Sequence, residues 1–241
     1  MVTMPPAALA DGVCLRISGL TKQYGSLRAL DDVTFEVRPG EVLGLIGPNG
    51  SGKTTLFECI GGVLPFDSGR VERRSAADVF YLPDGIAPWP EQPVRWALNY
   101  MCGFFGARDG MRERVMAALS LEPLLGKRIG ELSKGQRKRV LLAIGLLVPR
   151  PIVLADEPFD GLDLRQTRDV AAVLRDVARE GRTLVLSIHQ IVDAARVCDR
   201  FVLLSNGRIR GAGTLAELMT LAGDRSGAPV TGLEEAFLAL T

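Results

Sequence analysis

The most informative part of this sequence is Gly47-Pro48-Asn49-Gly50-Ser51-Gly52-Lys53-Thr54-Thr55. An apolar run at residues 42–46 precedes it and a second apolar segment at 56–60 follows it, which predicts strand, loop and helix in that order. In such a glycine-rich turn the backbone N–H groups point inward and meet the N-terminus of the helix, an arrangement that favours an anion. We expect all nine residues to form a phosphate-binding loop.

Lys53 and Thr54 give this loop its predicted chemistry. The ammonium group of Lys53 can reach the β- and γ-phosphates of a nucleoside triphosphate, while the hydroxyl of Thr54 offers Mg²⁺ an oxygen ligand. We therefore expect a nucleoside triphosphate and Mg²⁺ as ligands. Because GTPases, kinases and motor proteins also carry such a loop, the rest of the chain has to decide between these classes.

Composition narrows the class of protein. The 241 residues suffice for one elaborate domain or a domain with a sub-domain. A net charge of +1 gives no electrostatic support for binding nucleic acid or an anionic membrane. No apolar run reaches the roughly 18 to 20 residues of a membrane span, and residues 1–12 lack the pattern of a secretory signal. The four scattered cysteines predict buried free thiols, so we expect a soluble, cytoplasmic protein.

Segments around the loop predict strands at residues 13–20, 30–37, 68–71 and 78–82. Tyr24 lies between the first two of them. Its ring could stack on a purine, although a tyrosine considered alone is more often a packing or surface residue.

Three segments with helical periodicity follow, at residues 94–106, 112–125 and 133–148. They predict a helical sub-domain inserted in a nucleotide-binding core. Within one domain of 1–241 we expect a core of residues 1–86 and 150–215, a helical sub-domain of 87–149 and a C-terminal helical tail of 216–241. The third helix opens with Leu132-Ser133-Lys134-Gly135-Gln136, where Ser133 is a good N-cap and the helix start favours an anion. Considered alone, its basic residues indicate a solvated helix face.

The carboxyl ends of two predicted buried strands carry further polar residues. Residues 152–155 are apolar and lead into Asp156 and Glu157, at the end of a strand where α/β sheets bind ligands. We expect Asp156 to hold Mg²⁺ and Glu157 to polarise an attacking water. A strand at 183–188 ends at His189, the only histidine in the chain. A lone histidine is more often structural, but this position makes it available to a γ-phosphate oxygen.

The remaining segments predict a turn at 160–163, a helix at 164–179, a pair of strands at 199–204 and 208–211, and helices at 214–221 and 233–240.

Together these motifs resemble the ATP-binding subunit of an ABC transporter over about residues 13–215. The resemblance rests on the loop at 47–55, the LSGGQ-type signature at 132–136, the acidic strand at 152–157, the D-loop at 160–163 and the switch histidine His189. It implies an α/β fold: a P-loop NTPase core with a mostly parallel sheet, an N-terminal antiparallel part and an inserted helical sub-domain.

The resemblance also implies roles for individual residues. Tyr24 would stack on adenine, Glu157 would be the general base, and His189 would sense the γ-phosphate beside Lys53. Ser133, Gly135 and Gln136 of the signature would bind ATP held by a second protomer. The implied function is ATP hydrolysis by a homo- or heterodimer that encloses two ATP molecules. It would power transport through separate transmembrane subunits, which would dock beside residues 84–106 on the inner face of the cell membrane.

Two residues depart from the family pattern. Asp84 stands where the family usually has glutamine, and we expect it to offer an oxygen to Mg²⁺ or water. Lys134 replaces a glycine of the signature. By family analogy, Asp84 and the presence of a single ATP-binding domain favour a transporter that exports its substrate. The alternatives are a soluble ABC-type ATP switch acting on ribosomes or DNA and a non-hydrolysing regulatory module, and no nucleic acid is expected as a partner.

Overall fold

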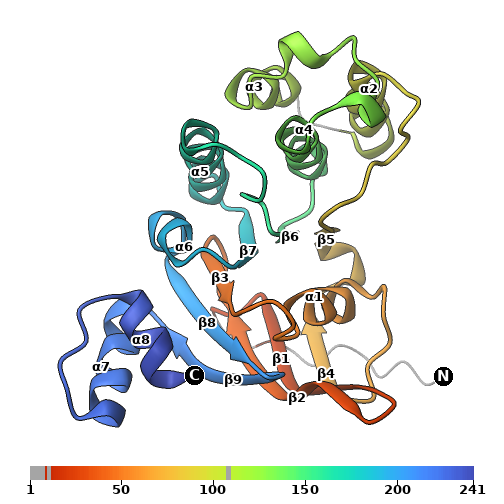
Figure 1. The fold of residues 1–241 in the computed structure, drawn as a ribbon. Coiled ribbons are helices and arrows are strands. Elements are labelled where there is room, and N and C mark those ends of the chain that lie inside the picture. Colours follow the sequence, from red (N-terminus) through yellow and green to blue (C-terminus); the bar gives the residue numbers. More distant parts are fainter. Residues whose placement is uncertain (1–8, 10–11, 107–109) are drawn as a thin grey trace.

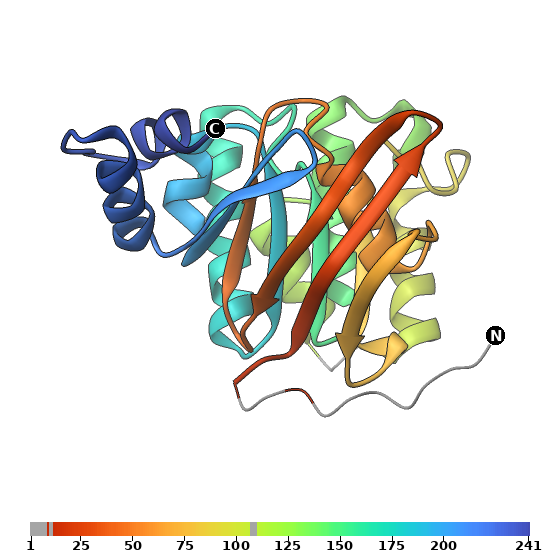
Figure 2. The same cartoon turned by 90° about the horizontal axis from the view of Figure 1, so that it is seen from below.

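Two β-sheets form the centre of the structure, a computed structural model that describes residues 9, 12–106 and 110–241 (Figure 1). In the smaller, antiparallel sheet the order is β2 (Leu27–Val37), β1 (Leu15–Tyr24) and β4 (Ser68–Arg73). Figure 2 shows these strands side by side.

The larger sheet is mostly parallel. Its strands lie in the order β5 (Val79–Leu82), β6 (Ile152–Asp156), β7 (Thr183–Ile188), β3 (Val42–Ile46), β8 (Arg200–Ser205) and β9 (Arg208–Gly213). Neighbours from β5 to β8 run parallel, and β9 pairs antiparallel with β8. The two sheets and the inserted helices confirm the predicted fold class.

The helices pack around the parallel sheet, and some of them lie beyond it at opposite ends of the molecule (Figure 1). They are α1 (Lys53–Gly61), α2 (Val94–Phe105), α3 (Met111–Ala118), α4 (Lys134–Leu147), α5 (Leu164–Arg179), α6 (Ile191–Val197), α7 (Leu215–Ser226) and α8 (Leu233–Leu240). Short 3₁₀ helices lie at Ala76–Asp78, Glu122–Leu124 and Ile129–Glu131.

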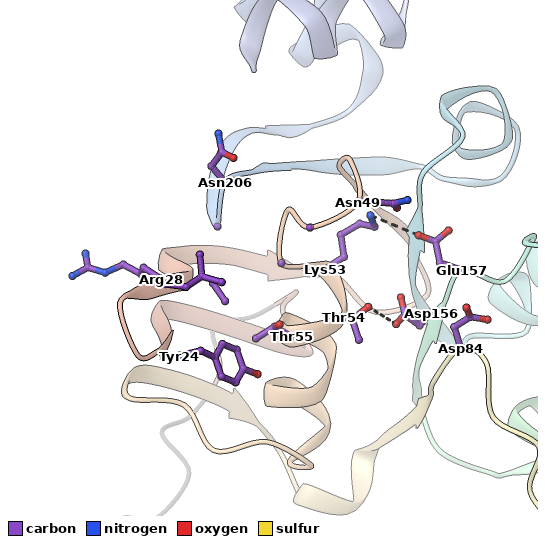
Figure 3. Close-up of a pocket in the computed structure, with 15 residues that line it drawn as sticks. Tyr24, Arg28, Asn49, Lys53, Thr54, Thr55, Asp84, Asp156, Glu157 and Asn206 are labelled. Atoms are coloured by element: carbon purple, nitrogen blue, oxygen red, sulfur yellow. Dashed lines mark hydrogen bonds and ion pairs between the residues drawn. The ribbon is translucent and has the colours of Figure 1, made fainter.

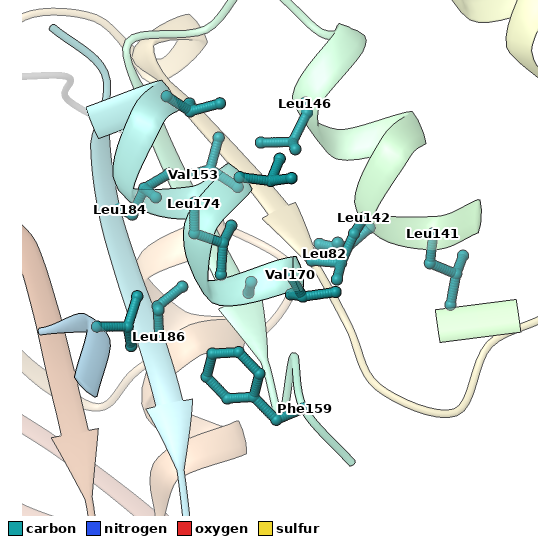
Figure 4. Close-up of a cluster of buried hydrophobic side chains, with 14 of the residues drawn as sticks. Leu82, Leu141, Leu142, Leu146, Val153, Phe159, Val170, Leu174, Leu184 and Leu186 are labelled. Carbon is teal, nitrogen blue, oxygen red and sulfur yellow. The ribbon is translucent and has the colours of Figure 1, made fainter. Parts of the chain in front are cut away.

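The core has two parts because side chains alternate across each buried strand. In β6, Ile152 and Leu154 belong to a cluster with α1 and the antiparallel sheet, whereas Val153 and Ala155 belong to a cluster with α4 and α5. Figure 4 shows the second cluster, in which Leu142 and Leu174 approach the sheet from these two helices. Both faces of the central strands are therefore apolar, which explains their continuous hydrophobic runs.

Some predicted boundaries were wrong. The helix expected at 112–125 ends at Ala118, because Ser120 adopts a positive φ of 51° and Pro123 follows. β1 continues to Tyr24 through irregular pairing, and α7 continues to Ser226. Helix α6 was not predicted, whereas α5 and β7 have the predicted bounds.

Composition also predicted that no segment spans a membrane and that the cysteines are buried free thiols. Among the described residues, no helix combines the length and the apolar character that crossing a membrane requires. All four cysteines are free; Cys59 and Cys198 are buried, and Cys14 and Cys102 are half-buried rather than buried as predicted. The prediction about a secretory signal in residues 1–12 falls on a segment that, apart from residues 9 and 12, lies outside the described residues.

Candidate functional site

The loops that follow the parallel strands meet at one edge of the sheet and line a cavity of about 560 Å³ (Figure 3). This volume is in the range of small-molecule sites. The predicted residues that line it are Tyr24, Asn49, Gly50, Gly52, Lys53, Thr54, Thr55, Asp84, Asp156 and Glu157.

Glycines let the phosphate loop pass close to its neighbours. A Cβ atom on Gly47 would lie 2.3 Å from the carbonyl oxygen of Leu204. Gly52 has a positive φ of 107°, and a Cβ atom there would lie 2.5 Å from the carbonyl oxygen of Ala29. Helix α1 starts at Lys53 without a side-chain cap, which leaves backbone N–H groups available to an anion. The loop thus has the shape and the donors of a phosphate cradle.

Lys53 and Thr54 connect this loop to the acidic residues. The Nζ atom of Lys53 donates to the carbonyl oxygens of Gly47 at 2.8 Å and Pro48 at 3.2 Å, and it lies 3.6 Å from Oε1 of Glu157. The hydroxyl of Thr54 donates to Oδ2 of Asp156 at 2.8 Å. Two of the three predicted Mg²⁺ ligands, Thr54 and Asp156, are therefore in contact.

Glu157 is held from several sides. Its Oε2 atom contacts Nδ1 of His189, so the predicted base and the predicted sensor are in contact. Its backbone N–H donates to Oγ of Ser187 at 2.9 Å, and the same hydroxyl donates to Oδ1 of Asp156. Sequence reasoning missed Ser187. The signal for it was a polar residue directly after the apolar run 184–186, two positions before the histidine.

Asp84 has a partner that the sequence did not suggest. Its Oδ1 atom pairs with the ammonium group of Lys138 in α4, a side chain that is only 5% exposed. Its predicted role toward Mg²⁺ or water stays a prediction.

The signature residues lie outside the lining of this cavity. Ser133 is the N-cap of α4: its Oγ accepts from the N–H of Gln136 at 3.3 Å, and Oε1 of Gln136 accepts from the N–H of Ser133 at 3.1 Å. A Cβ atom on Gly135 would lie 2.6 Å from the carbonyl oxygen of Gly161, so the signature packs directly on the predicted D-loop. One chain therefore does not bring Ser133 to its own phosphate loop.

An ion pair adds a second contact between the signature and the D-loop. The Nζ atom of Lys134 lies 2.6 Å from Oδ2 of Asp160. The hydrogen bond to Lys134 lowers the pKa of the Asp160 carboxyl below its usual value. Lys134, which departs from the family pattern, thus strengthens the contact between the signature and the D-loop.

The other end of the cavity is open and carries Tyr24, whose residue surface is 45% exposed. The ammonium group of Lys22 lies 5.5 Å from the centre of its ring. Five lining residues were missed from the sequence: Leu27, Arg28, Ala29, Asn206 and Gly207. They come from β2 and from the turn between β8 and β9, which was predicted as a turn but not placed against the loop.

Comparisons with known proteins agree with this geometry. A sequence model of the family described as ABC transporter matches residues 30–160, more than half of the chain. An uncharacterized ABC transporter ATP-binding protein of Methanocaldococcus jannaschii is 32% identical over 213 residues, which cover 85% of this chain and 79% of that protein. The chain belongs to the ABC transporter family.

Two further proteins place the chain within this family as an ATP-binding subunit of an ABC transporter. The hemin import ATP-binding protein of Thermobifida fusca is 33% identical over 250 residues, which cover 90% of this chain and 82% of that protein. A solved structure of the ATP binding subunit of an ABC transporter has a TM-score of 0.83 and 27% identity, and covers 94% of this chain and 99% of its own. Nucleotide binding by this ABC subunit follows from the family, whereas the roles of its individual residues stay predictions.

Proposed function

We propose that this ABC subunit binds ATP with Mg²⁺ in the cavity at the edge of the parallel sheet and hydrolyses it. The observation that carries the proposal is the chain of contacts from the phosphate loop to both acids. Thr54 bonds to Asp156 and Lys53 lies beside Glu157, which in turn contacts His189. A loop for phosphates, ligands for a hard cation and a base therefore meet in one place.

The cavity fits the ligands that the family implies. The glycine cradle and the start of α1 suit the phosphates, and the hydroxyl of Thr54 with the carboxylate of Asp156 suits Mg²⁺. When bound, the metal would neutralise charge that develops on the phosphates. The open end beside Tyr24 suits a nucleobase that stacks on its ring.

The reaction assigns a separate task to each of the remaining side chains. Glu157 orients a water molecule and accepts its proton. His189 holds Oε2 of Glu157 and thereby directs the carboxylate. Lys53 carries the positive charge that faces the phosphates, and carbonyl oxygens of the loop hold its ammonium group in place.

A second copy, or a related subunit, completes the site. Ser133, Gly135 and Gln136 do not line the cavity of their own chain, yet Ser133 starts a helix whose N-terminus suits a phosphate. We infer that two subunits pair head to tail and enclose two ATP molecules between them. Loss of the γ-phosphate removes the contact that joins the two subunits, so hydrolysis favours their separation.

An apolar groove supports docking on a separate transmembrane subunit. It has a volume of about 310 Å³ and is lined by residues of β5, the segment after it, α2 and α4, among them Phe80, Pro88 and Leu141. Trp89 and Phe104 on its rim are 37% and 68% exposed. We propose that a segment of the transmembrane subunit fills this groove, which places the ABC subunit on the inner face of the membrane.

We also propose how the domain is divided and in which direction transport runs. We keep 1–86 with 150–215 as the nucleotide-binding core, 87–149 as the helical sub-domain and 216–241 as the tail. Figure 1 shows α2, α3 and α4 gathered at one end of the molecule, in support of this division. Export stays a prediction from the sequence, since the relative from Thermobifida fusca is named for import.

Measurement of phosphate release tests the proposed function directly. We expect the purified chain to release phosphate from ATP when Mg²⁺ is present and to stop when the metal is chelated. Lys53→Ala should weaken ATP binding, because it removes the cation that faces the phosphates. Unchanged ATP affinity in Lys53→Ala would reject the assignment of the phosphate loop, and ATP binding without phosphate release by the wild type would favour a regulatory module.

A further inference from the structure

Ser187 occupies a position between the two acids of the site. It belongs to β7, the strand that lies between β6 and β3 in the sheet, and its residue surface is 0% exposed. Its Cα atom is the register partner of Asp156 on β6. Side chains of register partners stand on the same face of a sheet, so the hydroxyl of Ser187 is directed beside the carboxylate of Asp156.

The hydroxyl of Ser187 both accepts and donates a hydrogen bond. Oγ of Ser187 accepts the backbone N–H of Glu157 at 2.9 Å and donates its single proton to Oδ1 of Asp156. The other carboxylate oxygen of Asp156, Oδ2, accepts from Thr54. Asp156 is therefore held at both oxygens, by Ser187 on one side and by the phosphate loop on the other.

Glu157 has a backbone conformation that requires support. Its φ is +49°, in the left-handed region that a residue with a Cβ atom rarely adopts. The described contacts that hold it are the bond from its N–H to Ser187, a bond from the N–H of Asp160 to its carbonyl oxygen at 3.1 Å, and the contacts of its carboxylate with His189 and Lys53. Asp160 holds the carbonyl side of Glu157, whereas Ser187 holds its N–H, at the N–Cα bond about which φ is measured.

We propose that Ser187 is a positioning residue for hydrolysis, which rests on the proposed function above. One hydroxyl fixes the backbone of Glu157 and the carboxylate of Asp156 relative to each other. The predicted base and the predicted metal ligand are thereby set in a common geometry. Ser187 does not line the cavity, so it acts through its two neighbours and touches neither nucleotide nor metal.

This role predicts which properties change when the hydroxyl is lost. In Ser187→Ala, Asp156 loses the bond at Oδ1 and the N–H of Glu157 loses its acceptor. Turnover and the Mg²⁺ requirement depend on these two groups, whereas metal-free nucleotide binding depends on the phosphate loop. Loss of one such hydrogen bond corresponds to about a tenfold change in rate or affinity.

The test compares Ser187→Ala with Ser205→Ala, a matched removal of a buried serine at the end of β8. We expect Ser187→Ala to lower kcat by about tenfold and to raise the Mg²⁺ concentration for half-maximal binding of a fluorescent ATP analogue by about tenfold. Metal-free affinity for this analogue should stay within about twofold. Ser205→Ala should match the wild type in all three measurements.

Hydrogen exchange at the amide of Glu157 provides a readout that does not need nucleotide. We expect about tenfold faster exchange in Ser187→Ala and no change in Ser205→Ala. If Ser187→Ala does not fold, Ser187→Cys keeps a side chain at the site but offers a weak donor, and the same changes are expected. Unchanged exchange, or equal effects of the substitutions at 187 and 205, overturns the inference. A wild-type chain that binds no ATP overturns the proposed function instead.

Discussion

The ammonium group of Lys138 pairs with the carboxylate of Asp84 and so joins the segment after β5 to α4, the helix that begins after Ser133. The Lys138 side chain is 5% exposed and that of Asp84 is 34% exposed. The pair thus links a buried cation on the signature helix to an acid that lines the cavity.

This difference in burial predicts unequal costs of removing the two partners. Asp84→Ala leaves a buried cation without its acid and should lower the free energy of unfolding by about 2–3 kcal/mol. Lys138→Met leaves a partly solvated acid and should cost about 1 kcal/mol. The double variant should be more stable than Asp84→Ala alone, as measured by urea denaturation. Additive costs in the double variant would show that the two side chains are not coupled.

The contact between Lys134 and Asp160 predicts a pH effect at the signature. Lys134 lowers the pKa of Asp160 in the folded chain. The contribution of this ion pair to the free energy of unfolding is therefore complete above about pH 3.9, the pKa of an aspartate in the unfolded chain. It is lost as the pH falls through the lower pKa that Asp160 has in the folded chain.

Titration of the Asp160 carboxyl by NMR checks this effect. In Lys134→Gly, which restores the residue that is usual in the family, the pKa of Asp160 should rise toward its ordinary value. An identical titration curve in the variant would mean that Lys134 does not hold this carboxylate in solution.

Substitution of the predicted base separates binding from turnover. Glu157→Gln keeps the size of the side chain but removes its basicity, so phosphate release should fall by about 10² or more. ATP affinity should be retained, because the phosphate loop is intact. Near-normal phosphate release from this variant would reject Glu157 as the base.

Tyr24 is predicted to contribute to affinity through stacking alone. Tyr24→Ala should weaken ATP binding by about tenfold, within the range for one stacked base, and Tyr24→Phe should bind like the wild type. Tyr100→Ala provides a matched control, because Tyr100 is 43% exposed and lies outside the nucleotide cavity. Calorimetry measures all three affinities. A loss of affinity in Tyr24→Phe would point to the hydroxyl instead of the ring.

Much of the fold could be predicted because its signals are local. The loop at 47–55 sets the first strand and helix, and the apolar run that ends in Asp156 identifies a buried strand from its composition. The bounds of α5 and β7 followed from periodicity and flanking residues. The end of α3 did not, because periodic apolar residues continue past Ser120, whose positive φ ends the helix.

The contacts that complete the site could not be predicted because they depend on the order and register of strands. Ser187 contacts Asp156 because β7 lies beside β6 in the observed register. Asp84 and Lys138 are 54 positions apart, and nothing in the local pattern of either residue indicates the other. Asn206 was placed in a turn, but its position beside the phosphate loop comes from the pairing of β3 with β8.

We predict that ATP is bound between the loop around Lys53 in one copy and Ser133 in another. Sedimentation equilibrium of Glu157→Gln with ATP and Mg²⁺ examines this arrangement, because slow turnover preserves the bound state. We predict a dimer with ATP, a monomer without it, and a monomer when Ser133→Arg is added. A monomer at saturating ATP, or a dimer whose stability depends on neither ATP nor the substitution at Ser133, would rule out ATP binding between the two copies.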